Sequence, residues 1–233
     1  MTKNYLVVGG TSGIGAAVTR LLLDRGNRVL QLSRHPEQAV DAPGIRSLAW
    51  DATGPAWPAD ALPERLDGLV YCPGSIRLKP FARLRLDELR EDLELNLIGA
   101  VRAIQGALPA LQRAEQASVV MFSSVASQTG IPFHASVAAA KGAVEGLTRS
   151  LAAELAPTIR VNAIAPTVTD TRLAARLLGS ADKRQVAADR HPLKRVNGPD
   201  EVARTVMWLL DDAPSVTGQV IAVDGGLGAV RLL

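Results

Sequence analysis

The sequence has little cysteine, few aromatic residues and no large excess of either charge. Its only cysteine, Cys72, excludes an intramolecular disulfide and a cysteine-rich zinc site, and is typical of a reducing compartment. The 26 Lys and Arg residues against 23 Asp and Glu give a net charge of +3 over 233 residues. Because no block of like charges and no basic stripe with interleaved aromatics occurs, the sequence predicts no nucleic-acid partner.

Long hydrophobic runs are also absent. No apolar stretch reaches about 18 residues, the length that a membrane span needs, and the stretch that follows Asn4 is too short for a signal peptide. The content of 47% hydrophobic and 21% charged residues excludes a disordered chain. We therefore expect a cytoplasmic protein without a membrane partner, folded as a single domain over residues 1–233, since no shift in composition marks a boundary.

Short runs of Val, Ile and Leu alternate with stretches of helical periodicity. Strands are predicted at 5–8, 28–32, 46–50, 68–72, 118–122, 160–165 and 219–223, and helices at 14–25, 84–114 (interrupted near Asn96 and Gly99), 138–155 and 201–210. This alternation predicts an α/β fold: a doubly wound, mostly parallel, seven-stranded Rossmann-like sheet with helices on both faces. The more polar stretch 169–197 is predicted to be a substrate flap within that domain.

A glycine-rich segment follows the first predicted strand and opens the first helix. Its glycines are Gly9, Gly13 and Gly15, in the pattern G-x-x-x-G-x-G. Glycines at such a turn let a pyrophosphate approach the backbone, and a helix N-terminus offers free N–H groups and partial positive charge to it. The segment therefore predicts a nucleotide site.

The chain resembles the short-chain dehydrogenase/reductase family over essentially its whole length. The motifs that carry the resemblance are Gly9-Gly10-Thr11-Ser12-Gly13-Ile14-Gly15, Asn96 with Gly99, Ser123-Ser124, Lys141-Gly142-Ala143, residues 160–166 (RVNAIAP) and residues 217–226 (TGQVIAVDGG). The resemblance implies an oxidoreductase that transfers hydride between a nicotinamide dinucleotide and a carbonyl or alcohol substrate. It also implies that Thr11, Ser12 and Ile14, with the three loop glycines, help to bind the cofactor.

The residues after the second predicted strand bear on which dinucleotide binds. Ser33 stands where NAD-dependent members of the family carry an acid, and Arg34 follows it, so we expect NADP(H) rather than NAD(H). A second basic residue often precedes the middle glycine in NADP-type members, but Ser12 is at that position here. Asp51 resembles the family aspartate that contacts the adenine ring.

The resemblance implies a catalytic set of which one member is missing. Asn96, Ser124 and Lys141 match the family's asparagine, serine and lysine, but the proton-donating tyrosine four residues before the lysine is replaced by Val137. His134, or Ser124 or a water acting with Lys141, remain open as substitutes, because valine cannot donate a proton. The protein's two tyrosines, Tyr5 and Tyr71, lie elsewhere in the chain.

The resemblance places further residues around the nicotinamide, and some of them differ from the family pattern. Cys72-Pro73-Gly74 stands where many members have Asn-Ala-Gly, so Gly74 is kept, and Thr167 follows Pro166 where the family has glycine. Thr169 and Thr171 match residues that contact the nicotinamide amide.

Three functions therefore stay open: an NADP(H)-dependent reductase or dehydrogenase, a catalytically impaired NADPH-binding regulatory or scaffold protein, and a non-redox enzyme on the same fold. Small residues along 96–113 and 138–155 predict a homo-oligomer, a dimer or a tetramer. No metal site is expected.

Overall fold

The computed structural model describes residues 2–231 and contains one seven-stranded sheet in which every strand pair is parallel. The strands are β1 (Asn4–Val8), β2 (Arg28–Ser33), β3 (Ile45–Ala49), β4 (Gly68–Tyr71), β5 (Ala117–Phe122), β6 (Ile159–Pro166) and β7 (Val220–Val223). Their order is β3-β2-β1-β4-β5-β6-β7, so the order reverses between β1 and β4. The predicted doubly wound α/β fold is thus confirmed. Where the sequence predicted a mostly parallel sheet, all of the strand pairs among the described residues are parallel.

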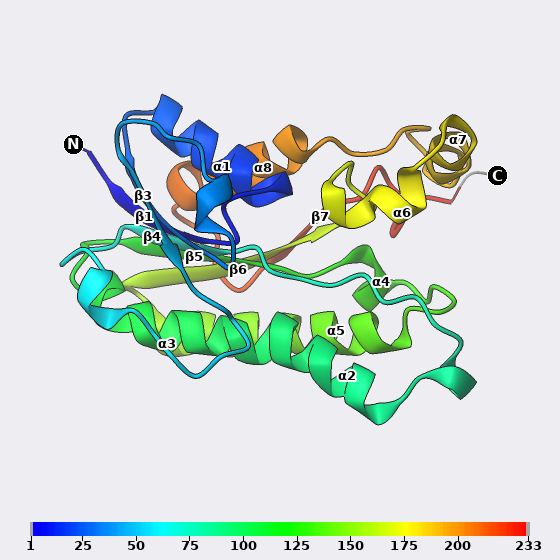
Figure 1. Ribbon diagram of the computed structural model, residues 1–233, viewed down its shortest axis with the longest axis horizontal. Coiled ribbons are helices and arrows are strands. Elements are labelled where there is room, and N and C mark those ends of the chain that lie inside the picture. Colours follow the sequence, from blue (N-terminus) through cyan, green and yellow to red (C-terminus); the bar gives the residue numbers. More distant parts are fainter. Residues whose placement is uncertain (1, 232–233) are drawn as a thin grey trace.

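Helices cover both faces of the sheet (Figure 1). The helices are α1 (Gly13–Asp24), α2 (Leu86–Leu93), α3 (Gly99–Leu111), α4 (Val125–Gln128), α5 (Ala135–Leu155), α6 (Ala175–Leu178), α7 (Ala181–Asp189) and α8 (Pro199–Met207). Alternate residues of β1 divide the core: Tyr5 and Val7 pack with α1 and α8, whereas Leu6 and Val8 pack with α3 and α5. Such alternation follows from the two-residue repeat of a strand whose two faces are both buried.

The interruption that the sequence predicts near Asn96 is a π-helical segment, Glu94–Ile98, which joins α2 to α3 without a break. Asn96 is buried there, and Tyr71 Oη donates a hydrogen bond to the Leu95 carbonyl at 2.6 Å. Gly99 is required beside it, because an added Cβ would lie 2.3 Å from Tyr71 Oη. The hydroxyl of Tyr71 is therefore engaged in holding this segment and is not directed at a substrate.

The predicted boundaries need small corrections, and short helices were missed. Helix α5 begins at Ala135, three residues earlier than predicted, and β3 begins one residue earlier. The predicted flap contains α6, α7 and a 3-10 turn at Arg172–Ala174, which its polar composition concealed. The base of the flap is closed by a β-bridge between Thr169 and Asn197, the two residues at which the predicted stretch begins and ends.

Candidate functional site

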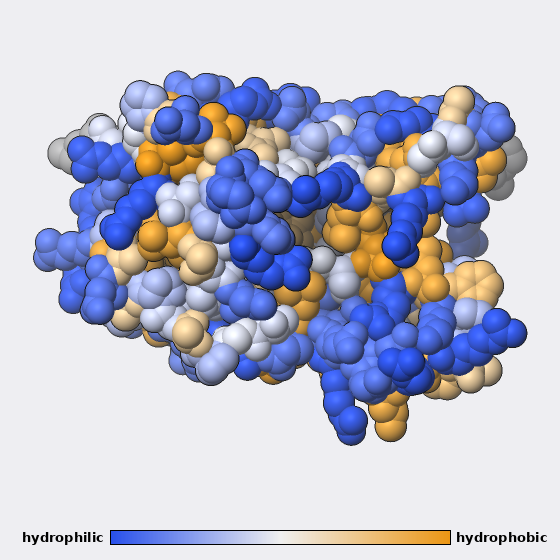
Figure 2. Space-filling view, viewed as in Figure 1, coloured by the Kyte–Doolittle hydropathy of each residue, from blue (hydrophilic) through white to orange (hydrophobic). Residues whose placement is uncertain are grey.

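A cleft of about 1540 Å³ opens at the carboxyl ends of the strands, next to the point where the strand order reverses. Ligands of open parallel sheets bind at such a switch point. In Figure 2 the surface is hollowed between the part that carries α6 and α7 and the part that carries α2, with hydrophobic residues inside the hollow. The cleft is lined by nearly all the residues that the sequence predicts for the site: Gly9, Thr11, Ser12, Gly13, Ile14, Gly15, Ser33, Arg34, Asp51, Gly74, Ser124, Val137, Lys141, Pro166, Thr169 and Thr171.

The glycine loop has the backbone that a phosphate cradle needs. Gly9 and Gly13 have φ of +75° and +54°, values that residues with a Cβ rarely adopt. A Cβ at Gly15 would lie 2.2 Å from the Gly9 carbonyl oxygen, so only glycine lets α1 pack against the loop. Ser12 caps α1 with extended backbone and no side-chain hydrogen bond, which leaves the first-turn N–H groups available to an anion.

Polar side chains gather at the ends of β2 and β3. Thr11 Oγ1 and Ser33 Oγ are 2.9 Å apart, which ties the glycine loop to the end of β2. Hydrogen bonds from the backbone and hydroxyl of Thr53, with a smaller contribution from Arg34, lower the pKa of Asp51. Among residues 2–231, no ion pair within 4.0 Å includes Arg34, so its guanidinium is available to a ligand.

These features fit a dinucleotide. The glycine loop with its positive φ angles, the uncapped helix N-terminus and the unpaired cation of Arg34 all line the cleft, and a pyrophosphate and an adenosine phosphate need groups of these kinds. A nicotinamide dinucleotide, when bound, supplies or accepts a hydride.

Lys141 is the buried cation of the site. Its Nζ donates a 2.8 Å hydrogen bond to the Phe122 carbonyl at the end of β5, and the residue is 6% exposed. Burial lowers the pKa of Lys141 to about 8, although Cys72 and Asp92 partly oppose the shift. Burial likewise raises the pKa of the Cys72 thiol to about 12, so that side chain stays protonated at neutral pH.

Asn96 lies behind the wall of the cleft rather than in it. A Cβ at Gly74 would lie 3.2 Å from Asn96 Oδ1 and 3.3 Å from Lys141 Nζ, so the two polar atoms converge on the space that this glycine leaves. Asn96 Oδ1 is buried and has no hydrogen-bond partner among the described residues. Its Nδ2 donates to the Asp92 carbonyl at 2.7 Å and to Ser75 Oγ at 3.0 Å, which holds the amide in place.

The position of the missing tyrosine lies in the cleft. Val137 lines it, one helical turn before Lys141 on α5, whereas the neighbouring Ser136 is buried and donates to the Asp92 carboxylate instead. Ser124 caps α4 by accepting a hydrogen bond from Ala126 N at 3.2 Å. His134 lines the cleft mouth, where its Nδ1 lies 2.8 Å from the Pro132 carbonyl oxygen. The valine therefore leaves an apolar surface where a proton donor is expected.

Sequence reasoning missed two buried polar residues near the site. Asp92 is four residues before Asn96, a spacing that places both on one helical face and offered a signal. His191 lies at the end of the flap, lines the cleft and is 2% exposed. Nothing in the local sequence distinguishes His191 from a surface histidine, because its partner Thr167 is 24 residues away.

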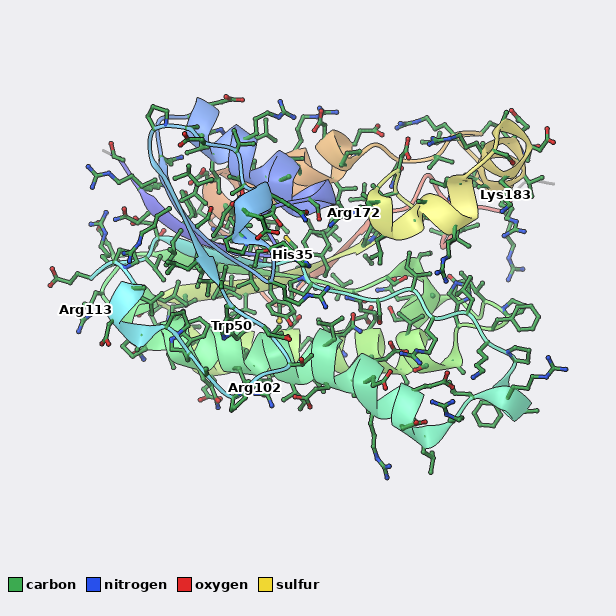
Figure 3. All side chains as sticks on the ribbon, viewed as in Figure 1. His35, Trp50, Arg102, Arg113, Arg172 and Lys183 are labelled. Carbon is green, nitrogen blue, oxygen red and sulfur yellow. The ribbon has the colours of Figure 1, made fainter. Side chains whose placement is uncertain are left out.

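Basic side chains line the flap side of the cleft. They are Arg172, Arg176, Lys183 and Arg190, and the acid that accompanies them is Asp182. No ion pair within 4.0 Å involves any of the four cations among residues 2–231. Arg172 donates to Gln38 Oε1 at 3.2 Å, which links the predicted flap to the segment after β2. Figure 3 labels Arg172 and Lys183 on this part of the chain.

Comparison with known proteins decides the family. The family model described as enoyl-(acyl carrier protein) reductase matches residues 8–228. The chain is 37% identical to cis-4-hydroxycyclohexanecarboxylate dehydrogenase from Sinomonas cyclohexanicum over 97% of this chain and 96% of that protein. It is 32% identical to carbonyl reductase family member 4 from Xenopus tropicalis, over 97% and 98% of the two chains. The chain belongs to the short-chain dehydrogenase/reductase family.

Solved structures of the family match the fold closely. The aldohexose dehydrogenase of Thermoplasma acidophilum superposes with a TM-score of 0.91 at 29% identity and covers 100% of this chain and 96% of its own. ElxO, solved with NADP bound, superposes with a TM-score of 0.85 at 26% identity, over 97% and 99% of the two chains. No helix within residues 2–231 combines the length and the hydropathy that crossing a membrane requires.

The burial of Lys141 predicts a pH-dependent cost to stability. The unfolded chain binds a proton at this lysine up to about pH 10.5, whereas the folded chain releases it near pH 8, so the free energy of unfolding rises with pH between these values. Across this pH range the free energy of unfolding rises by up to about 3 kcal/mol, since each pKa unit corresponds to ~1.4 kcal/mol. Urea unfolding of the wild type and of Lys141→Met should therefore show the wild type gaining stability relative to the variant from pH 7 to pH 10. A difference that stays constant across this range contradicts a buried, titrating ammonium.

Proposed function

We propose that the protein is an NADP(H)-dependent oxidoreductase that transfers hydride between the nicotinamide and a carbonyl or alcohol substrate. The observation that carries the proposal is the unpaired guanidinium of Arg34 in a cleft that also holds the glycine loop and Lys141. The relatives are dehydrogenases and reductases, and one structural neighbour binds NADP. We further propose a single domain over 1–233 with a flap at 169–197, and a cytoplasmic location, which the single cysteine favours.

In this proposal each predicted residue has a physical role. The backbone of Gly9, Gly13 and Gly15 receives the pyrophosphate, while Ser33, Arg34 and Asp51 bind the adenosine end. The Lys141 ammonium holds the nicotinamide ribose, a hydroxyl-bearing group that repays part of the cost of burying the charge. Pro166, Thr169 and Thr171 bound the nicotinamide, and Ser124 holds the substrate oxygen.

The flap cations point to the substrate. Because Arg172, Arg176, Lys183 and Arg190 line the cleft without ion-pair partners among the described residues, we propose that the substrate carries a carboxylate or another anionic group on an apolar body. The dehydrogenase relative acts on a cyclic alcohol with a carboxylate, which makes that alcohol and its ketone the first compounds to assay.

A second candidate function rests on Val137. Its side chain places a hydrocarbon where relatives have the proton donor, so a binding protein that senses NADPH, or a non-redox enzyme, is the alternative. NADPH binding and ketone reduction measured on one purified sample separate the three: turnover supports the oxidoreductase, binding alone supports the sensor, and product formation without cofactor consumption identifies the non-redox enzyme.

The first prediction concerns cofactor choice. Arg34 should favour the 2′-phosphate of NADPH over NADH by about 1.5–3 kcal/mol, through a charge-assisted hydrogen bond. Fluorescence titration of both reduced cofactors should show this preference in the wild type and its reversal in Arg34→Asp. Arg46→Asp, an exposed arginine outside the cleft, is the matched control and should keep the wild-type preference. Equal affinities in the wild type would refute the NADP assignment.

The second concerns the missing tyrosine. Val137→Tyr places a phenol one helical turn before Lys141, whose charge lowers the pKa of a neighbouring phenol. We expect reduction of a generic ketone or quinone to rise at least tenfold, at the lower end of what a positioned general acid contributes, with NADPH affinity within a few-fold. Because a tyrosine is much larger than the buried valine that it replaces, melting temperature and NADPH binding are measured first. If neither the wild type nor this folded, NADPH-binding variant reduces the ketone, the sensor is favoured.

The third concerns assembly. The small residues of α3 are used within the subunit, since a Cβ at Gly106 would lie 2.2 Å from Trp57 Cε2, but a Cβ at Gly142 or Gly146 on α5 meets no atom within 4 Å. We therefore propose that α5 forms the contact of a dimer or tetramer. Light scattering at micromolar concentration should show an oligomer that Gly146→Arg dissociates, whereas Gln116→Arg, at an exposed turn, leaves it intact. A monomeric wild type rules the contact out.

A further inference from the structure

Thr167 and His191 form a buried hydrogen-bonded pair in the wall of the cleft. Thr167 follows β6 and is 8% exposed, and His191 follows α7 and is 2% exposed. Their Oγ1 and Nε2 atoms are 2.7 Å apart, and both residues line the cleft. Neither residue belongs to the predicted catalytic set.

The second ring nitrogen of His191 determines how the pair is protonated. Nδ1 lies 2.7 Å from the Ala187 carbonyl oxygen, and a carbonyl only accepts, so Nδ1 carries a hydrogen. In the neutral imidazole Nε2 therefore accepts the hydrogen bond of the Thr167 hydroxyl. In the imidazolium Nε2 donates to Thr167 Oγ1, and the hydroxyl hydrogen is released to another acceptor. Both protonation states keep both hydrogen bonds of the ring, so gaining or losing a proton leaves no buried nitrogen unpaired.

The fold places Thr167 at the carboxyl end of the sheet, where the cleft opens. Strands β5 and β6 pair in parallel with Phe122 opposite Ile164, and Ser123 N donates to the Ile164 carbonyl at 2.7 Å. Ser124 stands two residues after the end of β5 and Thr167 directly after the end of β6, so both follow the carboxyl ends of adjacent parallel strands, and both line the cleft. Thr169 Oγ1 donates to the Thr167 carbonyl at 3.0 Å, and Thr167 N donates to the Val223 carbonyl at 3.2 Å, which hold the backbone.

We propose that Thr167, backed by His191, exchanges the substrate proton that the absent tyrosine would exchange. This inference rests on the proposed oxidoreductase function. Thr167 is then a catalytic residue, and His191 is a positioning residue that acts through it. With Val137 on α5, the usual proton donor is absent. Thr167 provides a hydroxyl directly after β6, at a position where the family has glycine, and both residues line the cleft.

The proton and electron balance is complete with the proposed cofactor. In reduction, the substrate's carbonyl carbon receives a hydride from the reduced nicotinamide as the C=O π bond breaks. The substrate oxygen then takes the proton of Thr167 Oγ1. Thr167 Oγ1 takes the Nε2 proton of the His191 imidazolium, and the neutral ring takes a proton from solvent before the next turnover. Oxidation of the alcohol runs the same transfers backwards, starting from the neutral ring.

Two variants of Thr167 test the pair: one removes the hydroxyl and keeps the size of the side chain, and the other keeps the hydroxyl. Thr167→Val should lower kcat for a cyclic ketone by 10²–10⁴-fold, the contribution of a positioned general acid, with the Kd for NADPH changed less than twofold. Thr167→Ser should restore most of kcat, because it keeps the hydroxyl. Thr148→Val removes a buried threonine hydroxyl that bonds only within α5, outside the cleft, and serves as the matched control with unchanged kcat.

A His191 variant and a rescue experiment distinguish a catalytic role of the pair from a purely structural one. His191→Gln should lower kcat more than tenfold while the KM for NADPH stays the same. In the Thr167→Val background, Val137→Tyr should recover activity, because a new donor replaces the lost one, and a merely structural defect is not repaired this way. Wild-type kcat in Thr167→Val, or loss of activity in His134→Gln but not in His191→Gln, overturns the pair while the oxidoreductase function stands. A wild type that binds NADPH and reduces no carbonyl compound overturns the function, and the pair with it.

Discussion

The buried ammonium of Lys141 is the constraint on which the arrangement of the site depends. A cation at 6% exposure needs polar partners, and the fold supplies one directly, the Phe122 carbonyl at the end of β5. The Asp92 carboxylate, held by Ser75, Ser136 and Arg77, lies within electrostatic reach on the other side. The end of β5, the π-helical segment and α5 thus meet around one charge.

The glycines around this charge follow from the same constraint. Gly74 leaves the space on which Lys141 Nζ and Asn96 Oδ1 converge, and Gly99 lets the π-helical segment approach Tyr71 closely enough to be held by its hydroxyl. Asn96 is the buried residue of the π-helical segment Glu94–Ile98. A Cβ at Gly99 would clash with Tyr71 Oη, and one at Gly74 would crowd Asn96 Oδ1 and Lys141 Nζ.

The two ends of the cleft have diverged differently from the family pattern. At the proposed adenosine end the glycine loop, Ser33, Arg34 and Asp51 all line the cleft, and a hydrogen bond between Thr11 and Ser33 joins the loop to the end of β2. At the nicotinamide end Val137, Cys72 and Thr167 change the chemistry: a hydrocarbon, a protonated thiol and a hydroxyl stand where the family has a phenol, an asparagine and a glycine. Since the hydroxyl of Thr167 bonds to a buried imidazole, one of these changes adds a group able to exchange protons, while another removes one.

The sequence by itself determined the mostly parallel seven-stranded α/β fold and the glycine-rich loop between its first strand and first helix, because these depend on local periodicity and on motifs that are contiguous in the chain. The spacing of four residues before Lys141 also predicts that Val137 stands at the position of the family's proton donor. Only the tertiary structure decided that Asn96 lies behind the wall, that Tyr71 is engaged with Leu95, and that His191 faces Thr167 across 24 residues. These contacts join residues that are far apart in the sequence, at the ends of different strands and helices. The periodicity of a single segment therefore cannot predict them.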